Sequence, residues 1–185
     1  MDAVIVAAGR GTRMRPLTDT RPKPLLPLGR TTILERTMDL CAPYVDRYVL
    51  VVGYRGEMIE THVGSEYAGL PVSYVTQTDR LGTAHAIGRA ADLVSGPFLA
   101  LNGDVVIDAS LVEQLATASG HALAVTTVDD PTSYGVVDTD GDRVTGLVEK
   151  PDDPQSNEVN VGLYAFDPSI FDAIEAIEPS SRGEY

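Results

Sequence analysis

Short apolar runs alternate along the first 120 residues with segments in which apolar side chains recur at helical spacing. The apolar runs are rich in Val, Leu and Tyr, have the length of strands, and cover residues 2–8, 47–54, 72–77 and 98–104. The helical segments cover residues 31–42, 55–63, 82–94 and 108–119. Because parallel strands are joined through helices, this alternation predicts an α/β sandwich around a parallel sheet.

The pattern changes after residue 120. The elements expected there are a strand over 121–128, a hairpin over 134–151, a strand over 160–167 and a helix over 168–177. The hairpin is expected to turn at Asp140–Gly141. The predicted fold class is therefore a three-layer α/β sandwich with a mixed, mostly parallel sheet. No repeat, low-complexity tract or linker divides the sequence.

Residues 10–30 are basic within an acidic chain. The chain carries 14 Lys and Arg side chains against 27 Asp and Glu, a formal net charge of −13. Beside the single acid Asp19, this segment holds Arg10, Arg13, Arg15, Arg21, Lys23 and Arg30. The flanking apolar sequences favour a folded anion site over a disordered basic arm. The acidic remainder repels nucleic acid and anionic membranes, so we expect neither as a partner.

Three further features concern the location of the protein. No apolar stretch approaches the ~20 residues of a membrane span, and the first residues have no signal-peptide architecture. Cys41 is the one cysteine, so no internal disulfide can form, and its place in a helical pattern predicts a core position. We therefore expect a cytoplasmic protein. The sequence carries no signal for its oligomeric state.

Open α/β sheets bind ligands at the carboxyl ends of their strands, which directs attention to the loops after 2–8, 72–77 and 98–104. In the first loop, Gly9 and Gly11 allow a tight turn that exposes backbone N–H groups to phosphate oxygens. A Rossmann dinucleotide fingerprint would need a third Gly where this chain has Met14, and the Gly-Lys-Ser/Thr of a P-loop does not occur. Both of these phosphate loops are disfavoured.

Longer motifs extend this interpretation. The string "AAGRGTRMRPLT" followed by "PKPLLPLG" resembles the signature of sugar-phosphate nucleotidyltransferases, also called sugar-nucleotide pyrophosphorylases. The motifs "QTDRLGTAHAI", "NGD", "YGVV", "VEKP" and "NVGLYAF" follow in the order of that family, so the resemblance covers nearly the whole chain. It implies a Rossmann-like fold of the nucleotide-diphospho-sugar transferase type. It also implies transfer of a nucleotidyl group from a nucleoside triphosphate to a sugar 1-phosphate, with release of pyrophosphate.

The resemblance assigns the triphosphate to the first loop. Arg13 and Lys23 are the expected catalytic residues: Arg13 would steady the departing pyrophosphate and Lys23 would contact the reacting phosphates. Ala8, Gly9 and Gly11 are expected to bind the nucleotide through the loop backbone. For Arg10, Arg15 and Arg21, ordinary surface charge is an equally good interpretation.

The same resemblance assigns the base to the loop after residues 72–77. Gln77 has the donor and acceptor needed to read a base edge, and Gly82 and Thr83 of the "LGT" motif would bring backbone close to it. These residues favour UTP or dTTP over GTP. We assign no chemistry to His85, which is expected to pack or to meet solvent.

Asp104 is the predicted Mg²⁺ ligand, because a carboxylate at the end of a strand is a hard oxygen donor. The alternative is a helix N-cap, for which Asp108 is the better candidate.

The sugar phosphate is assigned to the second half of the chain. By resemblance, Glu149 and Asn160 would bind sugar hydroxyls, Lys150 the phosphate, and Gly135 would allow close backbone approach. For Glu149, a salt bridge within the hairpin is the alternative. The phosphates of glucose, glucosamine, N-acetylglucosamine and mannose all remain open as substrates.

In the resembling family, the stretch "SSRGEY" leads into a segment that supplies a second metal-binding carboxylate. We therefore expect residues 1–185 to form a single nucleotidyltransferase domain that lacks its C-terminal segment. A second function stays open on this ground: a catalytically silent, pyrophosphorylase-like module that binds nucleotide for regulation. Retention of Arg13, Lys23, Asp104 and Lys150 favours the enzyme.

Overall fold

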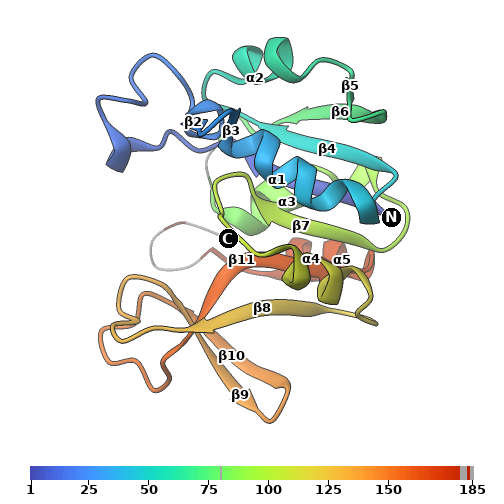
Figure 1. The fold of residues 1–185 in the computed structure, drawn as a ribbon. Helices are drawn as coiled ribbons and strands as arrows, with labels where there is room; N and C mark the ends of the chain where they lie inside the picture. The colour runs from blue at the N-terminus through green and yellow to red at the C-terminus, as the bar shows by residue number, and fades with distance from the viewer. Residues whose placement is uncertain (80, 180–182, 184–185) are drawn as a thin grey trace.

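The computed structural model describes residues 1–79, 81–179 and 183 (Figure 1). The strands are β1 (Asp2–Ala7), β2 (Pro27–Leu28), β3 (Thr31–Thr32), β4 (Arg47–Val52), β5 (Glu66–Tyr67), β6 (Leu70–Thr76), β7 (Phe98–Asn102), β8 (Ala122–Thr127), β9 (Gly135–Asp140), β10 (Arg143–Glu149) and β11 (Glu158–Phe166). The α-helices are α1 (Ile33–Cys41), α2 (Gly56–Val63), α3 (Thr83–Gly88), α4 (Ala109–Ala116) and α5 (Ser169–Ala176). Short 3₁₀ helices cover Thr12–Met14, Lys23–Leu25, Ala42–Tyr44 and Ala91–Leu93.

Within the described residues, the main sheet runs in the order β10-β9-β11-β7-β1-β4-β6-β5, and β8 also pairs with β11. Its central strands β7, β1, β4 and β6 are mutually parallel. Antiparallel pairings lie on both flanks, between β5 and β6 and among β7, β8, β9, β10 and β11. The expected mixed sheet is confirmed.

Helices cover both faces of the central strands (Figure 1). On one face, Leu34 of α1, Ile59 of α2 and Val112 of α4 belong to a single buried cluster. On the other face, Ile87 of α3 and Phe171 of α5 pack against the sheet. The result is the predicted three-layer sandwich, with parallel strands buried on both sides.

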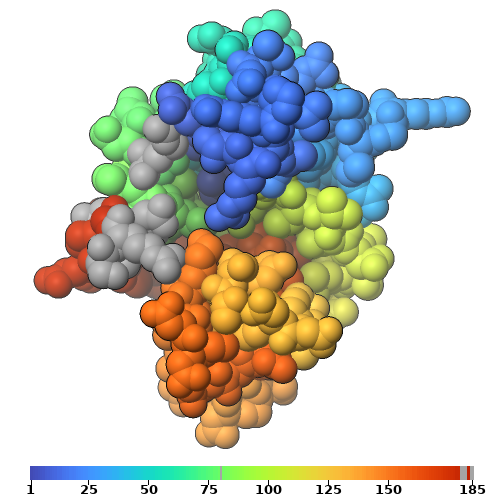
Figure 2. Space-filling model, turned by 90° about the vertical axis from the view of Figure 1, so that its left-hand side faces the viewer, coloured from blue at the N-terminus to red at the C-terminus, as the bar shows by residue number. Residues whose placement is uncertain are grey.

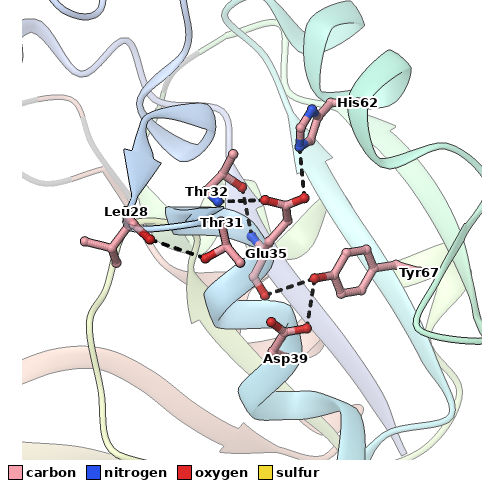
Figure 3. A network of polar contacts seen from close by, with 7 residues as sticks. All are labelled: Leu28, Thr31, Thr32, Glu35, Asp39, His62 and Tyr67. Atoms are coloured by element: carbon pink, nitrogen blue, oxygen red, sulfur yellow. Dashed lines mark hydrogen bonds and ion pairs between the residues drawn. The ribbon is translucent and has the colours of Figure 1, made fainter.

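Helix α1, which buries one face against the sheet, begins with a capping box, drawn in Figure 3. The Thr32 N–H donates to Glu35 Oε2 (2.6 Å), and the Glu35 N–H donates to Thr32 Oγ1 (3.1 Å). Glu35 Oε1 also lies 3.2 Å from Nε2 of His62 on α2. Burial alone would raise the pKa of Glu35, but the hydrogen bonds from Thr32 and the contact with His62 outweigh it and lower the pKa. This network fastens the start of α1 to α2.

Cys41 ends α1 and is fully buried, as expected from its place in the helical pattern. Burial raises the pKa of its thiol to about 12, so the thiol is protonated at neutral pH. Its contribution is therefore to packing.

The structure differs from the sequence prediction at the helix α3 and at the short strands β2, β3 and β5, which were not predicted. The helix expected over 82–94 ends at Gly88 and is followed by a 3₁₀ turn at Ala91–Leu93. Glycine is a poor helix former, and position 88 faces α5, where an added Cβ would lie 3.1 Å from Ile174 Cγ2. The small hairpin of β2 and β3 was not predicted, because two-residue strands leave no alternating pattern. Within the described residues, no helix combines the length and apolarity needed to cross a bilayer.

Candidate active site

The loop after β1 is folded and anchored, so the basic segment is not a disordered arm. Gly11 has φ +62°, and its carbonyl accepts a hydrogen bond from Thr18 Oγ1 (2.8 Å). A Cβ at position 11 would lie 2.9 Å from Lys23 Cβ, so only glycine lets the two arms of the loop approach this closely.

A second anchor comes from the loop after β4. The Tyr54 N–H donates to the Ala8 carbonyl (3.2 Å), and the Tyr54 hydroxyl donates to the Thr18 carbonyl (3.3 Å). The guanidinium carbons of Arg10 and Arg55 lie 5.5 and 5.4 Å from the centre of the Tyr54 ring. Arg10 therefore contacts an aromatic ring as well as solvent.

The first cavity, of about 350 Å³, opens beside this loop. Its lining contains five of the predicted residues: Gly9, Gly11, Arg13, Lys23 and Asp104. Strand order explains the convergence, because β1 and β7 are parallel neighbours with Val6 opposite Asn102, so their following loops emerge together. Ala8, which was expected to bind the nucleotide, is 2% exposed and does not line this cavity.

Lys23 and Asp104 form an ion pair in the first cavity, with 2.5 Å between Nζ and Oδ2. Their side chains are 28% and 38% exposed, so the pair is open to solvent. Asp104 lies four residues before the N-cap position of α4, which Asp108 occupies without a side-chain capping bond. The capping alternative for Asp104 is therefore wrong.

The donor set around Asp104 bears on Mg²⁺. Among the described residues, no three His, Cys, Asp or Glu side chains gather into a metal-ligating group. Mg²⁺ often takes only one or two carboxylates and completes its shell with water and substrate phosphates, which a single Asp beside a phosphate cavity can satisfy. Asp104 fits that limited role and remains the predicted ligand.

The second cavity, of about 760 Å³, adjoins the first. It is lined by five further predicted residues: Thr83, Gly135, Glu149, Lys150 and Asn160. Arg13 and Asn102 line both cavities and mark where they meet. Figure 2 shows the surface hollowed between the blue N-terminal segment and the yellow-orange segment that contains β8, β9 and β10.

The hairpin of β9 and β10 presents Glu149 and Lys150 to the second cavity. Lys150 Nζ contacts Glu149 Oε1, so the alternative of a hairpin salt bridge is present. The Lys150 N–H donates to the Tyr134 carbonyl (2.8 Å), and Lys150 has φ +49°. A Cβ at Gly135 would lie 3.2 Å from Glu149 Oε2, so glycine leaves room for this carboxylate.

Asn160 is held by its own strand, β11. Its Oδ1 accepts from the Gly162 N–H (2.8 Å), and its Nδ2 donates to the Tyr164 hydroxyl (2.6 Å). Gly162 has φ +76°, and a Cβ there would lie 2.2 Å from Asn102 Nδ2. Sequence reasoning assigned no role to Asn102, Gly162 or Tyr164, although all three stand inside the quoted motifs "NGD" and "NVGLYAF".

Gln77 follows β6, two strands away from β1 in the sheet order. Its side chain is 5% exposed, and neither Gln77 nor Gly82 lies in the lining of the two cavities. The amide nitrogen of Gln77 contacts the Gly82 carbonyl (3.2 Å) and Nδ1 of His85 (2.9 Å). His85 is therefore a polar partner of a predicted base-binding residue, which its expected packing role did not include.

Comparison with known families decides the classification. A family model described as nucleotidyl transferase matches residues 2–185. The chain belongs to the nucleotidyl transferase family.

Curated relatives in this family are more than a third identical to this chain over the aligned residues. The bifunctional protein GlmU of Methanococcus aeolicus is 39% identical over 185 residues, which are 100% of this chain and 44% of that protein. The UTP–glucose-1-phosphate uridylyltransferase AglF of Haloferax volcanii is 38% identical over 193 residues, covering 100% of this chain and 79% of AglF. The chain thus spans less than half the length of GlmU and about four-fifths of AglF.

Solved structures of nucleotidyl transferases have the same fold. A glucose-1-phosphate thymidylyltransferase from Bacillus anthracis, in complex with sucrose, matches with a TM-score of 0.87 and 27% identity, over 100% of this chain and 78% of that one. A UDP-glucose pyrophosphorylase complexed with UDP-glucose matches with a TM-score of 0.86 and 23% identity, over 99% of this chain and 82% of that one. The Rossmann-like fold class expected from the motifs is confirmed.

Proposed function

We propose that this member of the nucleotidyl transferase family transfers the nucleotidyl group of UTP or dTTP to a hexose 1-phosphate. A phosphate oxygen of the sugar 1-phosphate attacks the α-phosphorus of the triphosphate. The bond from that phosphorus to the α–β bridging oxygen breaks, and pyrophosphate leaves with the bonding electrons. The products are a nucleotide-sugar and pyrophosphate.

One observation carries this proposal: two adjoining cavities, each lined by a lysine, share Arg13 at their junction. Lys23 lines the first cavity and Lys150 the second, and these are the only two lysines in the chain. A reaction between two polyanions needs positive charge on both reactants and at the point where they meet.

Each of the predicted site residues has its own role in this reaction. The Gly9–Gly11 backbone and Arg13 hold the triphosphate, and Arg13 stabilises charge on the departing pyrophosphate. Lys23 contacts the reacting phosphates, and Lys150 holds the phosphate of the sugar. Glu149 and Asn160 orient the sugar hydroxyls. When bound, Mg²⁺ held by Asp104 would offset negative charge on the phosphates. A cytoplasmic location belongs to the same proposal.

The choice of UTP or dTTP rests on Gln77 and on the relatives. The AglF relative is named for action on UTP and glucose 1-phosphate, and the Bacillus anthracis protein is described as a thymidylyltransferase. Both bases carry the same imide edge, which an amide side chain can read.

The alternative, a catalytically silent nucleotide-binding module, is favoured by one feature. Asp104 is paired with Lys23, and among the described residues no three His, Cys, Asp or Glu side chains gather into a metal-ligating group. The two functions share nucleotide binding and differ in turnover.

Pyrophosphate release tests the proposal. The purified chain is supplied with Mg²⁺ and every pairing of four nucleoside triphosphates with the 1-phosphates of glucose, glucosamine, N-acetylglucosamine and mannose. We expect release only with UTP or dTTP and one sugar phosphate, and its loss in Arg13→Ala. Nucleotide binding without release from any pair would favour the silent module.

A further inference from the structure

Gln77 and His85 form a polar pair that the proposed roles leave unexplained. Gln77 follows β6 with its side chain almost fully buried, and His85 lies half-buried on α3. The Gln77 amide nitrogen lies 2.9 Å from His85 Nδ1 and 3.2 Å from the Gly82 carbonyl oxygen. Both partners belong to the segment that begins α3, so the start of this helix surrounds one end of the amide.

These two contacts define which way the amide points. A carbonyl oxygen only accepts, so the group that faces Gly82 is the NH₂ end of Gln77. An NH₂ group has two hydrogens, and the second is directed at Nδ1 of His85. His85 must then accept at Nδ1, which places its ring proton on Nε2.

Both donors of Gln77 are therefore occupied inside the protein. Its Oε1 accepts no hydrogen bond from any residue that the structure describes. Because no buried side-chain oxygen or nitrogen of these residues lacks a partner, this oxygen is accessible from outside the protein. Gln77 has both donor and acceptor as an amino acid, but in this fold it offers a ligand only an acceptor.

We propose that His85 is a positioning residue that fixes the Gln77 amide so that the nucleobase meets an acceptor. This inference rests on the proposed function, in which Gln77 reads the base. An acceptor selects a base edge with a hydrogen, such as the N3–H of uracil or thymine, and it repels the N3 lone pair of cytosine. Selection of the base is thus set by a histidine that need not touch the nucleotide.

Hydrogen bonds to both His85 and Gly82 fix the orientation of the Gln77 amide. Without the imidazole, the amide retains only the longer hydrogen bond to Gly82, and the energetic difference between its two orientations becomes smaller. A rotated amide would then present NH₂ to cytosine N3. Loss of His85 should consequently reduce the difference in affinity between UTP and CTP without abolishing nucleotide binding.

Binding of UTP, N3-methyl-UTP and CTP, measured by titration calorimetry, tests the inference. We expect the wild-type chain to bind UTP at least about tenfold more tightly than the other two. In His85→Leu the UTP-to-CTP ratio should fall about fivefold, mainly through weaker UTP binding. His85→Asn should recover most of the ratio, because its side-chain oxygen can accept in place of Nδ1.

His121→Leu is the matched control, because His121 contacts Ser169 and the Phe166 ring, which are far from Gln77 in the sequence. The UTP-to-CTP ratio of this variant should equal that of the wild type. If His85→Leu does not fold, His85→Ala provides the same test. An unchanged UTP-to-CTP ratio in folded His85→Leu or His85→Ala would overturn the inference and leave the proposed function standing. Equal wild-type affinities for UTP and CTP would also overturn it. Absence of any nucleotide binding by the wild type would instead contradict the proposed function.

Discussion

The ammonium of Lys23 lies 2.5 Å from a carboxylate oxygen of Asp104, although 81 residues separate them in the sequence. The pair joins the loop after β1 to the loop after β7, inside the smaller cavity. Because both side chains remain partly exposed, the pair itself contributes little to stability. Its importance lies in holding a cation and a carboxylate where phosphates are proposed to react.

Replacing Lys23 should separate catalysis from folding. Lys23→Ala should lower the rate of nucleotidyl transfer about 10²-fold or more, because a charge-stabilising donor is lost at the reacting phosphates. The free energy of unfolding should change by less than about 1 kcal/mol, as for an exposed ion pair. Steady-state kinetics and urea unfolding measure the two effects. Arg30→Ala, which removes an exposed cation of the same segment, is the control and should keep its activity.

Asp104→Asn tests the metal assignment. If Asp104 contacts Mg²⁺, this change should raise the Mg²⁺ concentration needed for half-maximal transfer about tenfold, because a neutral amide is a weaker ligand than a carboxylate. Titrating Mg²⁺ at saturating substrates measures the shift, and Asp108→Asn serves as the control, since Asp108 lines the second cavity but not the first. An identical Mg²⁺ response in Asp104→Asn and the wild type would remove Asp104 from the metal site.

The capping box of α1 should stabilise the fold. Thr32→Ala should cost about 1 kcal/mol of unfolding free energy, because the Glu35 N–H loses its acceptor. Thr31→Ala, which removes only a 3.4 Å contact to the Leu28 carbonyl, should cost much less (Figure 3). Equal losses in the two variants, measured by urea unfolding at pH 7, would refute a capping role for Thr32.

Glu35 makes this contribution dependent on pH. Its folded-state pKa is lowered, so the stability that its carboxylate contributes is fully present above the unfolded-state pKa of about 4.3. It is lost as the pH falls through the lower folded-state pKa. The difference in stability between the wild type and Glu35→Gln should therefore be larger above the unfolded-state pKa than below the folded-state pKa. Urea unfolding from pH 7 down to pH 3 measures this difference, and a constant gap would contradict the prediction.

Gly162 should tolerate no side chain. Gly162→Ala places a Cβ 2.2 Å from Asn102 Nδ2 and forces a φ of +76° on an L-residue. We expect a loss of about 2–4 kcal/mol in stability and weaker sugar-phosphate binding, because Asn160 takes its orientation from the Gly162 N–H. Gly141→Ala is matched in φ (+61°) but has open space around it, and it should cost only about 1 kcal/mol. Calorimetric melting and substrate titration distinguish the two variants.

The central strands could be predicted because their apolar runs are unbroken, a pattern that burial on both faces requires. The strand pairs β2–β3 and β5–β6 depend on single turns and on neighbouring loops, and β5 has only two residues, too few to leave a pattern. Glycine at position 88 gives a local signal for the end of α3, but the close approach of Ile174 to this position joins segments far apart in the sequence.

The site divides in the same way. Gly9, Arg13, Lys23 and Asp104 could be brought together by motif and by strand order, since the loops of parallel neighbours emerge at one edge. The orientation of Gln77 could not be predicted, because it depends on which hydrogen-bond partners the start of α3 offers. The need for glycine at position 162 likewise could not be predicted, because it arises from the close approach of Asn102 on the neighbouring strand β7.

The most direct test of the central claim is the identity of the product, followed by ³¹P NMR. The chain is incubated with Mg²⁺, UTP and the hexose 1-phosphate that supports pyrophosphate release. Transfer between the two cavities predicts equal amounts of pyrophosphate and a nucleotide-sugar with two coupled diphosphate resonances, both lost in Arg13→Ala. Formation of UMP and pyrophosphate with the sugar phosphate unconsumed, or no turnover despite nucleotide binding, would contradict it.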